Sequence, residues 1–147
     1  MHDHSPDQHF LRMVTDHHQG MREMAHAAMN RPEAPADVRS KAQEIDQKQH
    51  AELKHMTSML EQEFGDRYEP KVMPDNERMI ERVQRADGGT VDRTFYETVI
   101  EHHAQGVQMI DEHLPKLSHP KVRQMAEKMK TDQQQEIGEL QGKIADR

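Results

Sequence analysis

The sequence predicts an all-α protein, a four-helix bundle built from a duplicated helical hairpin. Long segments carry apolar residues at helical spacing, prolines and glycines separate these segments, and two stretches of the first half recur in the second half. Aromatic residues make up only 3% of the 147 residues, so aliphatic residues and methionine must fill the core. Such a core suits long antiparallel helices better than a β-sandwich.

A first helical hairpin is expected over residues 7–64. Residues 1–6 read as a polar arm, and a helix follows to about residue 30. The segment NRPEAP (30–35) ends this helix because it holds two prolines, which remove backbone donors and clash with the preceding turn. A second helix is then predicted over residues 36–64, where a glycine follows it.

The connection covers residues 65–89 and is expected to contain a short helix. Gly65 and two prolines bound a loop, and DNERMIERVQRA (75–86) has helical spacing, with Asp75 as the expected N-cap. Two consecutive glycines end this short helix.

A second helical hairpin is expected over residues 90–147, so that residues 1–147 form a single domain. Its first helix is predicted over residues 91–114, where a proline stops it. Ser118 is the expected N-cap of the last helix, which carries a proline in its first turn and runs to about residue 144.

The duplication is visible in two alignments. FLRMVTDHHQGMREM (10–24) matches FYETVIEHHAQGVQM (95–109) without a gap, and VRSKAQEIDQKQHAEL (38–53) matches VRQMAEKMKTDQQQEI (122–137) after a shift of one residue. Both helices of the first hairpin therefore recur, and two such hairpins pack with approximate two-fold symmetry.

Composition narrows the classes of function. The net charge of −7 and the lack of a basic stripe argue against a nucleic-acid partner, and no apolar run is long enough for a membrane span. No signal peptide is recognisable at the start of the sequence. The chain has 12 histidines and 12 methionines but no cysteine, which excludes thiolate metal sites and disulfides and favours ligands that suit copper.

The first histidine pair lies on a predicted helix with an apolar stripe. At 100° per residue, Met13, Met21 and Met24 lie within about 40° of His17, so this histidine is central to the stripe. His18 lies at the edge of the stripe. The spacing places thioethers and an imidazole along one ridge, a donor set that suits Cu(I).

The second pair occupies the matching positions. His102 is central to its stripe, His103 lies at the edge, and Met109 follows about two turns later. The two central histidines are expected to approach each other near the two-fold axis. Thr98 and Gly106 replace the first two methionines of the other copy, so the soft cluster is stronger in the first half.

A structural interpretation stands beside the metal site, because a single histidine on an apolar face is more often an ordinary core residue. Buried imidazole needs hydrogen-bond partners, and four polar residues lie on or beside the apolar stripes of the other two helices. These are Gln49, Glu52, Gln133 and Glu136. They form either a polar core or a set of groups that orient metal-binding histidines.

The motif DHHQGMREMA, a proline-containing loop and the pattern Q-x-x-E-L-x-x-M (49–56) resemble the DUF305 family, which includes copper-binding CopM-type proteins. The resemblance covers nearly the whole chain as two copies of the family hairpin. It implies a ferritin-like four-helix bundle, an exported protein in the periplasm or outside the cell, and a set of metal-ligand positions. These are His17, His18, Met21 and Met24 in the first copy and His102, His103 and Met109 in the second.

The sequence is compatible with three functions. The first is copper binding or buffering through histidine and methionine, with zinc or another transition metal as a further possibility and weaker binding at pH 5 than at pH 7.5. The second is a structural or interaction bundle without a metal. The third is a di-metal carboxylate oxidase, because EMAH (23–26) and ELKH (52–55) have the E-x-x-H spacing, although their duplicates lack the histidine. We assign no catalytic residue, and a homodimer stays open.

Overall fold

The computed structural model describes residues 4–147, so residues 1–3 of the expected polar arm lie outside the described part. Over the described residues the chain is all-α, as predicted. Its elements are α1 (Pro6–Met29), α2 (Ala36–Phe64), α3 (Pro74–Gln84), α4 (Val91–His113), the short 3₁₀ helix η1 (Leu114–Lys116) and α5 (Pro120–Ala145).

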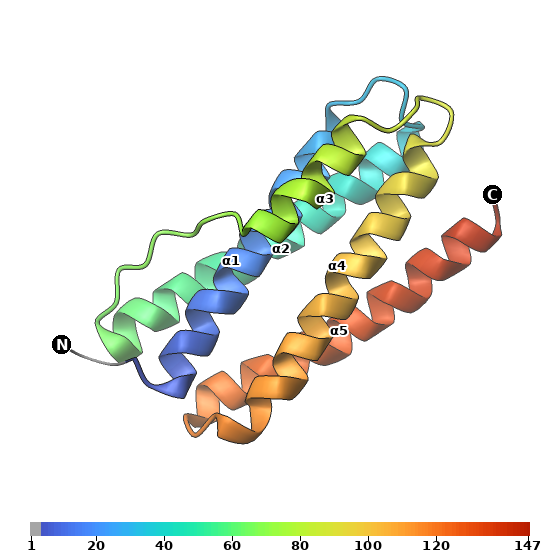
Figure 1. The fold of residues 1–147 in the computed structure, drawn as a ribbon. Coiled ribbons are helices and arrows are strands. Elements are labelled where there is room, and N and C mark those ends of the chain that lie inside the picture. Colours follow the sequence, from blue (N-terminus) through green and yellow to red (C-terminus); the bar gives the residue numbers. More distant parts are fainter. Residues whose placement is uncertain (1–3) are drawn as a thin grey trace.

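The four long helices form the predicted bundle (Figure 1). Helix α1 packs along α2, α4 packs along α5, and the two hairpins meet where α1 contacts α4. The short helix α3 lies against both α1 and α4. The α1–α4 contact therefore joins the two hairpins, and ion pairs from Lys41 join α2 to α5.

Two of the predicted N-caps are wrong. Asp75 lies inside the first turn of α3, because Pro74 takes the first helical position and Met73 becomes the cap residue. His119 caps α5, where its Nδ1 accepts a hydrogen bond from the Lys121 amide at 3.3 Å. Ser118 instead donates its amide and hydroxyl to the buried Asp7 carboxylate.

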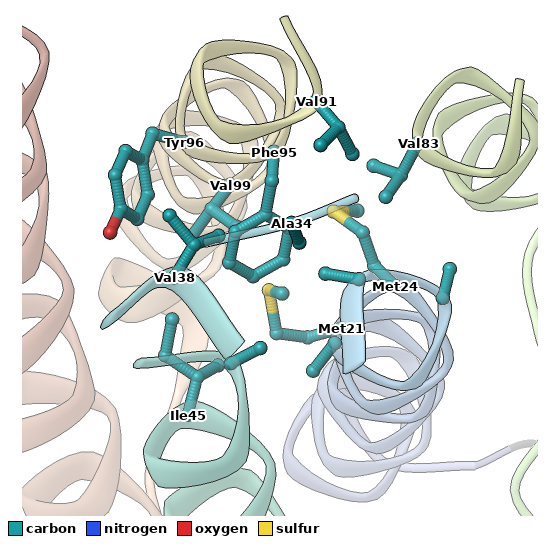
Figure 2. Packing of buried hydrophobic residues seen from close by; sticks show 14 of the residues in the cluster. Met21, Met24, Ala34, Val38, Ile45, Val83, Val91, Phe95, Tyr96 and Val99 are labelled. Atoms are coloured by element: carbon teal, nitrogen blue, oxygen red, sulfur yellow. The ribbon is translucent and has the colours of Figure 1, made fainter. Parts of the chain in front are cut away.

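The apolar core consists of two clusters. The larger one joins both hairpins and α3, and Figure 2 shows Met21 and Met24 of α1 pointing among Phe95 and Val99 of α4. The second cluster gathers around Phe10 at the other end of the bundle. His17 and His18 follow Phe10 and precede Met21 along α1, and His102 and His103 lie between Val99 and Ile110 along α4. Both pairs therefore lie between the two clusters.

The residue before each histidine pair points outward and holds the connection between the hairpins. Asp16 accepts hydrogen bonds from the Tyr68 hydroxyl at 2.6 Å and the Lys71 amide at 2.9 Å. Glu101, its counterpart in the repeat, pairs with Arg82 of α3 at 2.6 Å. These contacts fix the connection against α1 and α4 without using the inward face that carries the histidines.

We predict that Gly20→Ala destabilises the fold by about 1–3 kcal/mol. A Cβ atom at this position would lie 2.8 Å from the Cβ of Asn76, a buried residue of α3, so α3 would have to move away from α1. Gly138 of α5 is the control, because an added Cβ meets nothing within 4 Å there. Gly138→Ala should gain up to about 1 kcal/mol from helix propensity. Urea denaturation followed by circular dichroism measures both, and a stable Gly20→Ala variant would contradict the close α1–α3 contact.

Candidate metal centre

The two central histidines meet, as the repeat predicts. His17 of α1 and His102 of α4 stack with ring centroids 3.6 Å apart and an angle of 17° between the planes. Both side chains are almost completely buried. The contact lies where the two hairpins touch, so each half of the duplicated chain contributes one imidazole to the same place.

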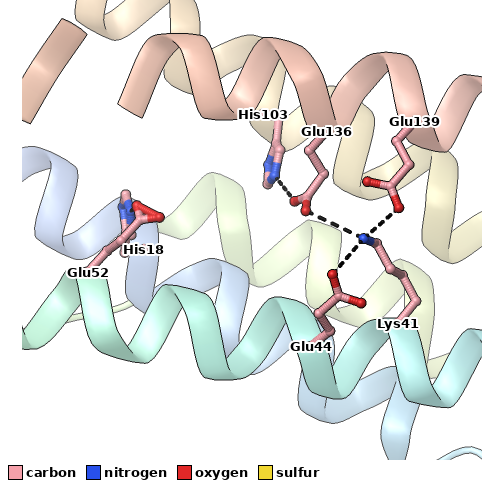
Figure 3. Close-up of polar contacts among 7 residues, drawn as sticks. All are labelled: His18, Lys41, Glu44, Glu52, His103, Glu136 and Glu139. Atoms are coloured by element: carbon pink, nitrogen blue, oxygen red, sulfur yellow. Dashed lines mark hydrogen bonds and ion pairs between the residues drawn. The ribbon is translucent and has the colours of Figure 1, made fainter. Parts of the chain in front are cut away.

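The neighbouring histidines are also buried, although the periodicity of a single helix places them at the edge of the stripe. His18 is fully buried and His103 is 2% exposed, because α2 and α5 cover this flank of α1 and α4. Glu52 of α2 lies 3.2 Å from Nε2 of His18, and Glu136 of α5 lies 2.6 Å from Nε2 of His103 (Figure 3). Each histidine pair is thus matched by one carboxylate from its own hairpin.

His18 and His103 differ in how many of their ring nitrogens have a partner. Both partners of His18, the Glu52 carboxylate and the Val14 carbonyl, are acceptors, so each ring nitrogen of His18 already faces an oxygen atom. His103 donates from Nε2 to Glu136, which leaves the lone pair on Nδ1. A carboxylate that fixes the tautomer of an imidazole in this way is the usual support of a metal-binding histidine.

Several buried polar atoms have no hydrogen-bond partner among the described residues. In this cluster they are Nε2 of His17, both ring nitrogens of His102, Nδ1 of His103 and Oε1 of Gln133. Each unmatched buried polar atom costs about 1–3 kcal/mol, so five of them in one place are costly unless water or a metal ion matches them. A neutral imidazole carries one N–H and one lone pair, so each of the three rings offers one nitrogen donor and Gln133 offers an oxygen, of the kind that hold transition metals.

The electrostatics keep the central rings neutral. Desolvation by burial, assisted by the neighbouring histidines, lowers the pKa of His17 to about 3. The same causes lower the pKa of His102 well below its ordinary value. Both rings therefore carry a lone pair at neutral pH, and a metal ion would not have to displace a proton from them.

Lys41 of α2 pairs with the carboxylate that contacts His103 and with two further carboxylates. Its buried ammonium lies 3.8 Å from Glu136 and 2.8 Å from Glu139, both on α5, and 3.3 Å from Glu44 (Figure 3). Burial raises the pKa of Glu136, but the hydrogen bond to His103 and the charge of Lys41 outweigh it and lower the pKa overall. Glu136 thus stays ionised and continues to accept from His103.

Gly106 is a residue of this site that the sequence reasoning missed. A Cβ atom at this position would collide with Oε1 of Gln133 and lie 3.0 Å from the His17 ring. The bare backbone of α4 therefore allows Gln133 and His17 to approach it. A glycine inside a helix was the available signal, because it is unfavourable there unless packing requires it.

The methionines are distributed differently from the histidines. Met21 and Met24 lie fully buried in the larger apolar cluster, while Met13 and Met109 are half-buried, and Met109 packs against the cluster around Phe10. The polar residues Gln49 and Gln133 are buried. The structure thus gathers the four histidines, Glu52, Glu136 and Gln133, whereas the methionines pack above and below them.

No three His, Asp or Glu side chains within residues 4–147 already form a metal-ligand set. Unpartnered imidazole nitrogens from both hairpins are nevertheless buried together, and nitrogen donors of this kind are compatible with a transition metal. Of the two E-x-x-H segments, EMAH (23–26) does not add to the centre, and ELKH (52–55) contributes Glu52 alone. Glu23 accepts from Gln19 and His26 pairs with Asp46 at 3.0 Å, so this segment lies toward the surface of the bundle.

Acid should destabilise the fold through His17. Its pKa is near 6.5 in the unfolded chain and about 3 in the folded protein, so only the unfolded state binds the proton between these values. Stability is then full above pH 6.5 and falls as the pH drops toward 3, by about 2 kcal/mol between pH 7 and pH 5. His17→Leu should lose this part of the pH dependence of urea unfolding, and His50→Leu at an exposed position should retain it. Equal pH dependence in His17→Leu and the wild type would contradict the desolvation of His17.

Comparisons with known proteins agree on the fold. The structure superimposes on a DUF305 fragment from Deinococcus radiodurans with a TM-score of 0.81, 23% identity and coverage of 97% of both chains. CopM in its Cu(I)-bound form gives 0.78 and 24% identity, covering 95% of this chain and 96% of CopM. A DUF305 protein from Streptomyces coelicolor, described as secreted, gives 0.80 and 23%, covering 97% of this chain and 93% of its own.

The sequence comparisons identify the family. A search of curated proteins finds no significant match. The model of a domain of unknown function, DUF305, matches residues 7–143, and the chain therefore belongs to the DUF305 family.

Proposed function

We propose that the protein binds copper at the histidine cluster between its two hairpins. The observation that carries this proposal is the set of buried, unpartnered nitrogens on His17, His102 and His103, next to the unpartnered oxygen of Gln133. A purely structural polar core would match these atoms with each other or with neighbouring side chains. Imidazole suits copper in both common oxidation states, and the chain offers no thiolate that would favour a structural zinc site.

The local charge favours a monovalent ion. Glu52 and Glu136 each contribute a carboxylate to the cluster, and Lys41 neutralises one of them. A buried cation needs a nearby opposite charge to offset its desolvation, and Glu52 has no lysine or arginine partner among the ion pairs of the described residues. Cu(I) is therefore the expected form in the cluster, with the imidazoles of His17, His102 and His103 as ligands. Met21 lies one helical turn from His17 as a candidate thioether ligand.

The relatives support this proposal at the level of the metal. Structures of CopM are known in a Cu(I)-bound and a Cu(II)-bound form, and both share the fold of this chain. We infer a role in binding or buffering copper outside the cytoplasm, which the secreted relative from Streptomyces coelicolor supports. None of the helices described over residues 4–147 carries an apolar stretch that could cross a membrane.

The test is an anaerobic Cu(I) titration against a competing chromophoric chelator. Wild type should bind tightly, and His17→Ala/His102→Ala should lose more than about tenfold in affinity because it removes the ligands from both halves. His26→Ala/His50→Ala is the matched control, because these two histidines lie toward the surface. Circular dichroism checks that each variant is helical. A helical double variant with unchanged affinity would favour the metal-free structural or interaction bundle.

The metal affinity of the cluster should depend less on pH than the affinity of histidines with an ordinary pKa. Because the pKa of His17 is about 3 and that of His102 is lowered as well, protons compete little with a metal for these rings at pH 5. We therefore expect the affinity of the cluster to change less than about threefold between pH 7.5 and pH 5.5, where an ordinary imidazole ligand would cost about tenfold. The same titration at both pH values measures it, and a tenfold or larger loss would show that the ligands are histidines with an ordinary pKa.

A further inference from the structure

A groove separates α2 from α5 on the side of the bundle opposite the contact of α1 with α3. Its volume is about 630 Å³. Glu52, His55 and Met59 line it from α2, and Met125 and Met129 line it from α5. Glu52 also contacts His18. It therefore lies between the groove and the histidine cluster.

The internal repeat relates this groove to the Lys41 ion-pair network. Helices α2 and α5 correspond at an offset of 84 residues, as Val38 and Val122 show. At this offset Lys41 corresponds to Met125, and its three carboxylate partners correspond to three residues that line the groove. These pairs are Glu136 with Glu52, Glu139 with His55, and Glu44 with Lys128.

The two halves of the α2–α5 interface are therefore closed in different ways. In one half the Lys41 ammonium bridges the helices by pairing with Glu136 and Glu139. In the other half Met125 stands in place of the lysine, and it presents a thioether beside Glu52 and His55. Where one half has the ammonium of Lys41, the other half therefore has thioether and imidazole donors that can bind a metal cation.

The other charges of the groove are already paired. Lys121 contacts Glu63 at 3.0 Å, and Lys128 contacts Asp132 at 2.9 Å. Among the ion pairs that the described residues form, Glu52 pairs only with His18 and has no lysine or arginine partner. Its side chain is 24% exposed, so this carboxylate gives the groove a net negative charge that water-borne cations can reach.

The donors themselves select a soft metal. His55 and Met59 are four residues apart on α2, and Met125 and Met129 are four residues apart on α5, so each pair lies on one face of its helix. Three thioethers and one imidazole suit Cu(I) and are poor ligands for magnesium, calcium or manganese. Methionine side chains have three rotatable bonds, which lets them adjust to an ion between the helices.

We propose that the α2–α5 groove is a second, solvent-accessible Cu(I) site, held by Met125, Met129 and His55 with Met59 as a further thioether ligand and Glu52 as the compensating charge. This site is distinct from the histidine cluster and does not require a metal there. It gives the protein one shielded and one exposed site for the same ion.

Methyl NMR on protein labelled with [methyl-¹³C]methionine tests this proposal directly, because Cu(I) is diamagnetic and a thioether that binds it shifts its own methyl signal. Substitution to leucine assigns each signal. On anaerobic addition of Cu(I) alone, the methyl groups of Met125 and Met129 should shift in the wild type. They should also shift in His17→Ala/His102→Ala, so that failure of the histidine cluster does not remove the signal of the groove.

Stoichiometry provides the second measurement. Met125→Leu/Met129→Leu should bind one Cu(I) fewer than the wild type, whereas Met29→Leu/Met79→Leu, altered in the larger apolar cluster, should bind the same number. Met125→Lys should keep the fold and also lose one equivalent, because its ammonium can bridge to Glu52 as Lys41 does to Glu136. Unshifted Met125 and Met129 signals, or an unchanged stoichiometry in the leucine and lysine variants, would overturn the proposal and leave the groove as a surface for an apolar helix.

Discussion

The stacking of His17 on His102 is the contact on which the rest of this bundle depends. It lies where the two halves of the chain meet, and it puts polar rings in the layer that separates two apolar clusters. Burial of these rings opposes folding, because their nitrogens leave water without gaining hydrogen bonds. The two apolar clusters must therefore supply the free energy that stabilises the fold. The layer between them holds the histidine side chains proposed to bind the metal.

The duplicated halves have diverged most where they surround this layer. Gly106 occupies the position of Met21, and the missing side chain lets Gln133 and His17 both approach the backbone of α4. Lys41 occupies the position of Met125, and its ammonium closes one side of the α2–α5 interface. In each of these two pairs, one half of the chain has a methionine and the other half has a different residue. The sequence repeat thus preserves the histidines, but not the charge and space around them.

The sequence predicted the elements of the fold closely. Helix α2 has the expected bounds, because a proline precedes it and Gly65 adopts the left-handed conformation that ends it. The approach of His17 to His102 also followed from sequence, since the repeat places equivalent residues about the same axis. Caps were harder to predict, because a cap depends on which polar group faces the first turn. His119 faces that turn in α5, while Ser118 is held by Asp7.

The surroundings of the site could not be predicted from one helix at a time. The stripe of α1 shows which residues face α4, but His18 is buried by a second neighbour, α2, whose position depends on the whole bundle. Glu52 and Glu136 were found because they lie beside the stripes of their own helices. Gly106 and the groove depend on the spacing between helices, and no periodicity in the sequence reports that distance.

Glu52 links the two proposed sites through one carboxylate. It accepts from His18 on its inner side and borders the groove on its outer side, so a cation in the groove and the imidazole of His18 draw on the same charge. Binding at one place then changes the free energy of binding at the other, and linkage makes this effect equal in both directions. Glu136 has no such freedom, because Lys41 holds it from the outside. The coupling between the sites therefore runs through the first half of the duplicated chain, although the histidines come from both.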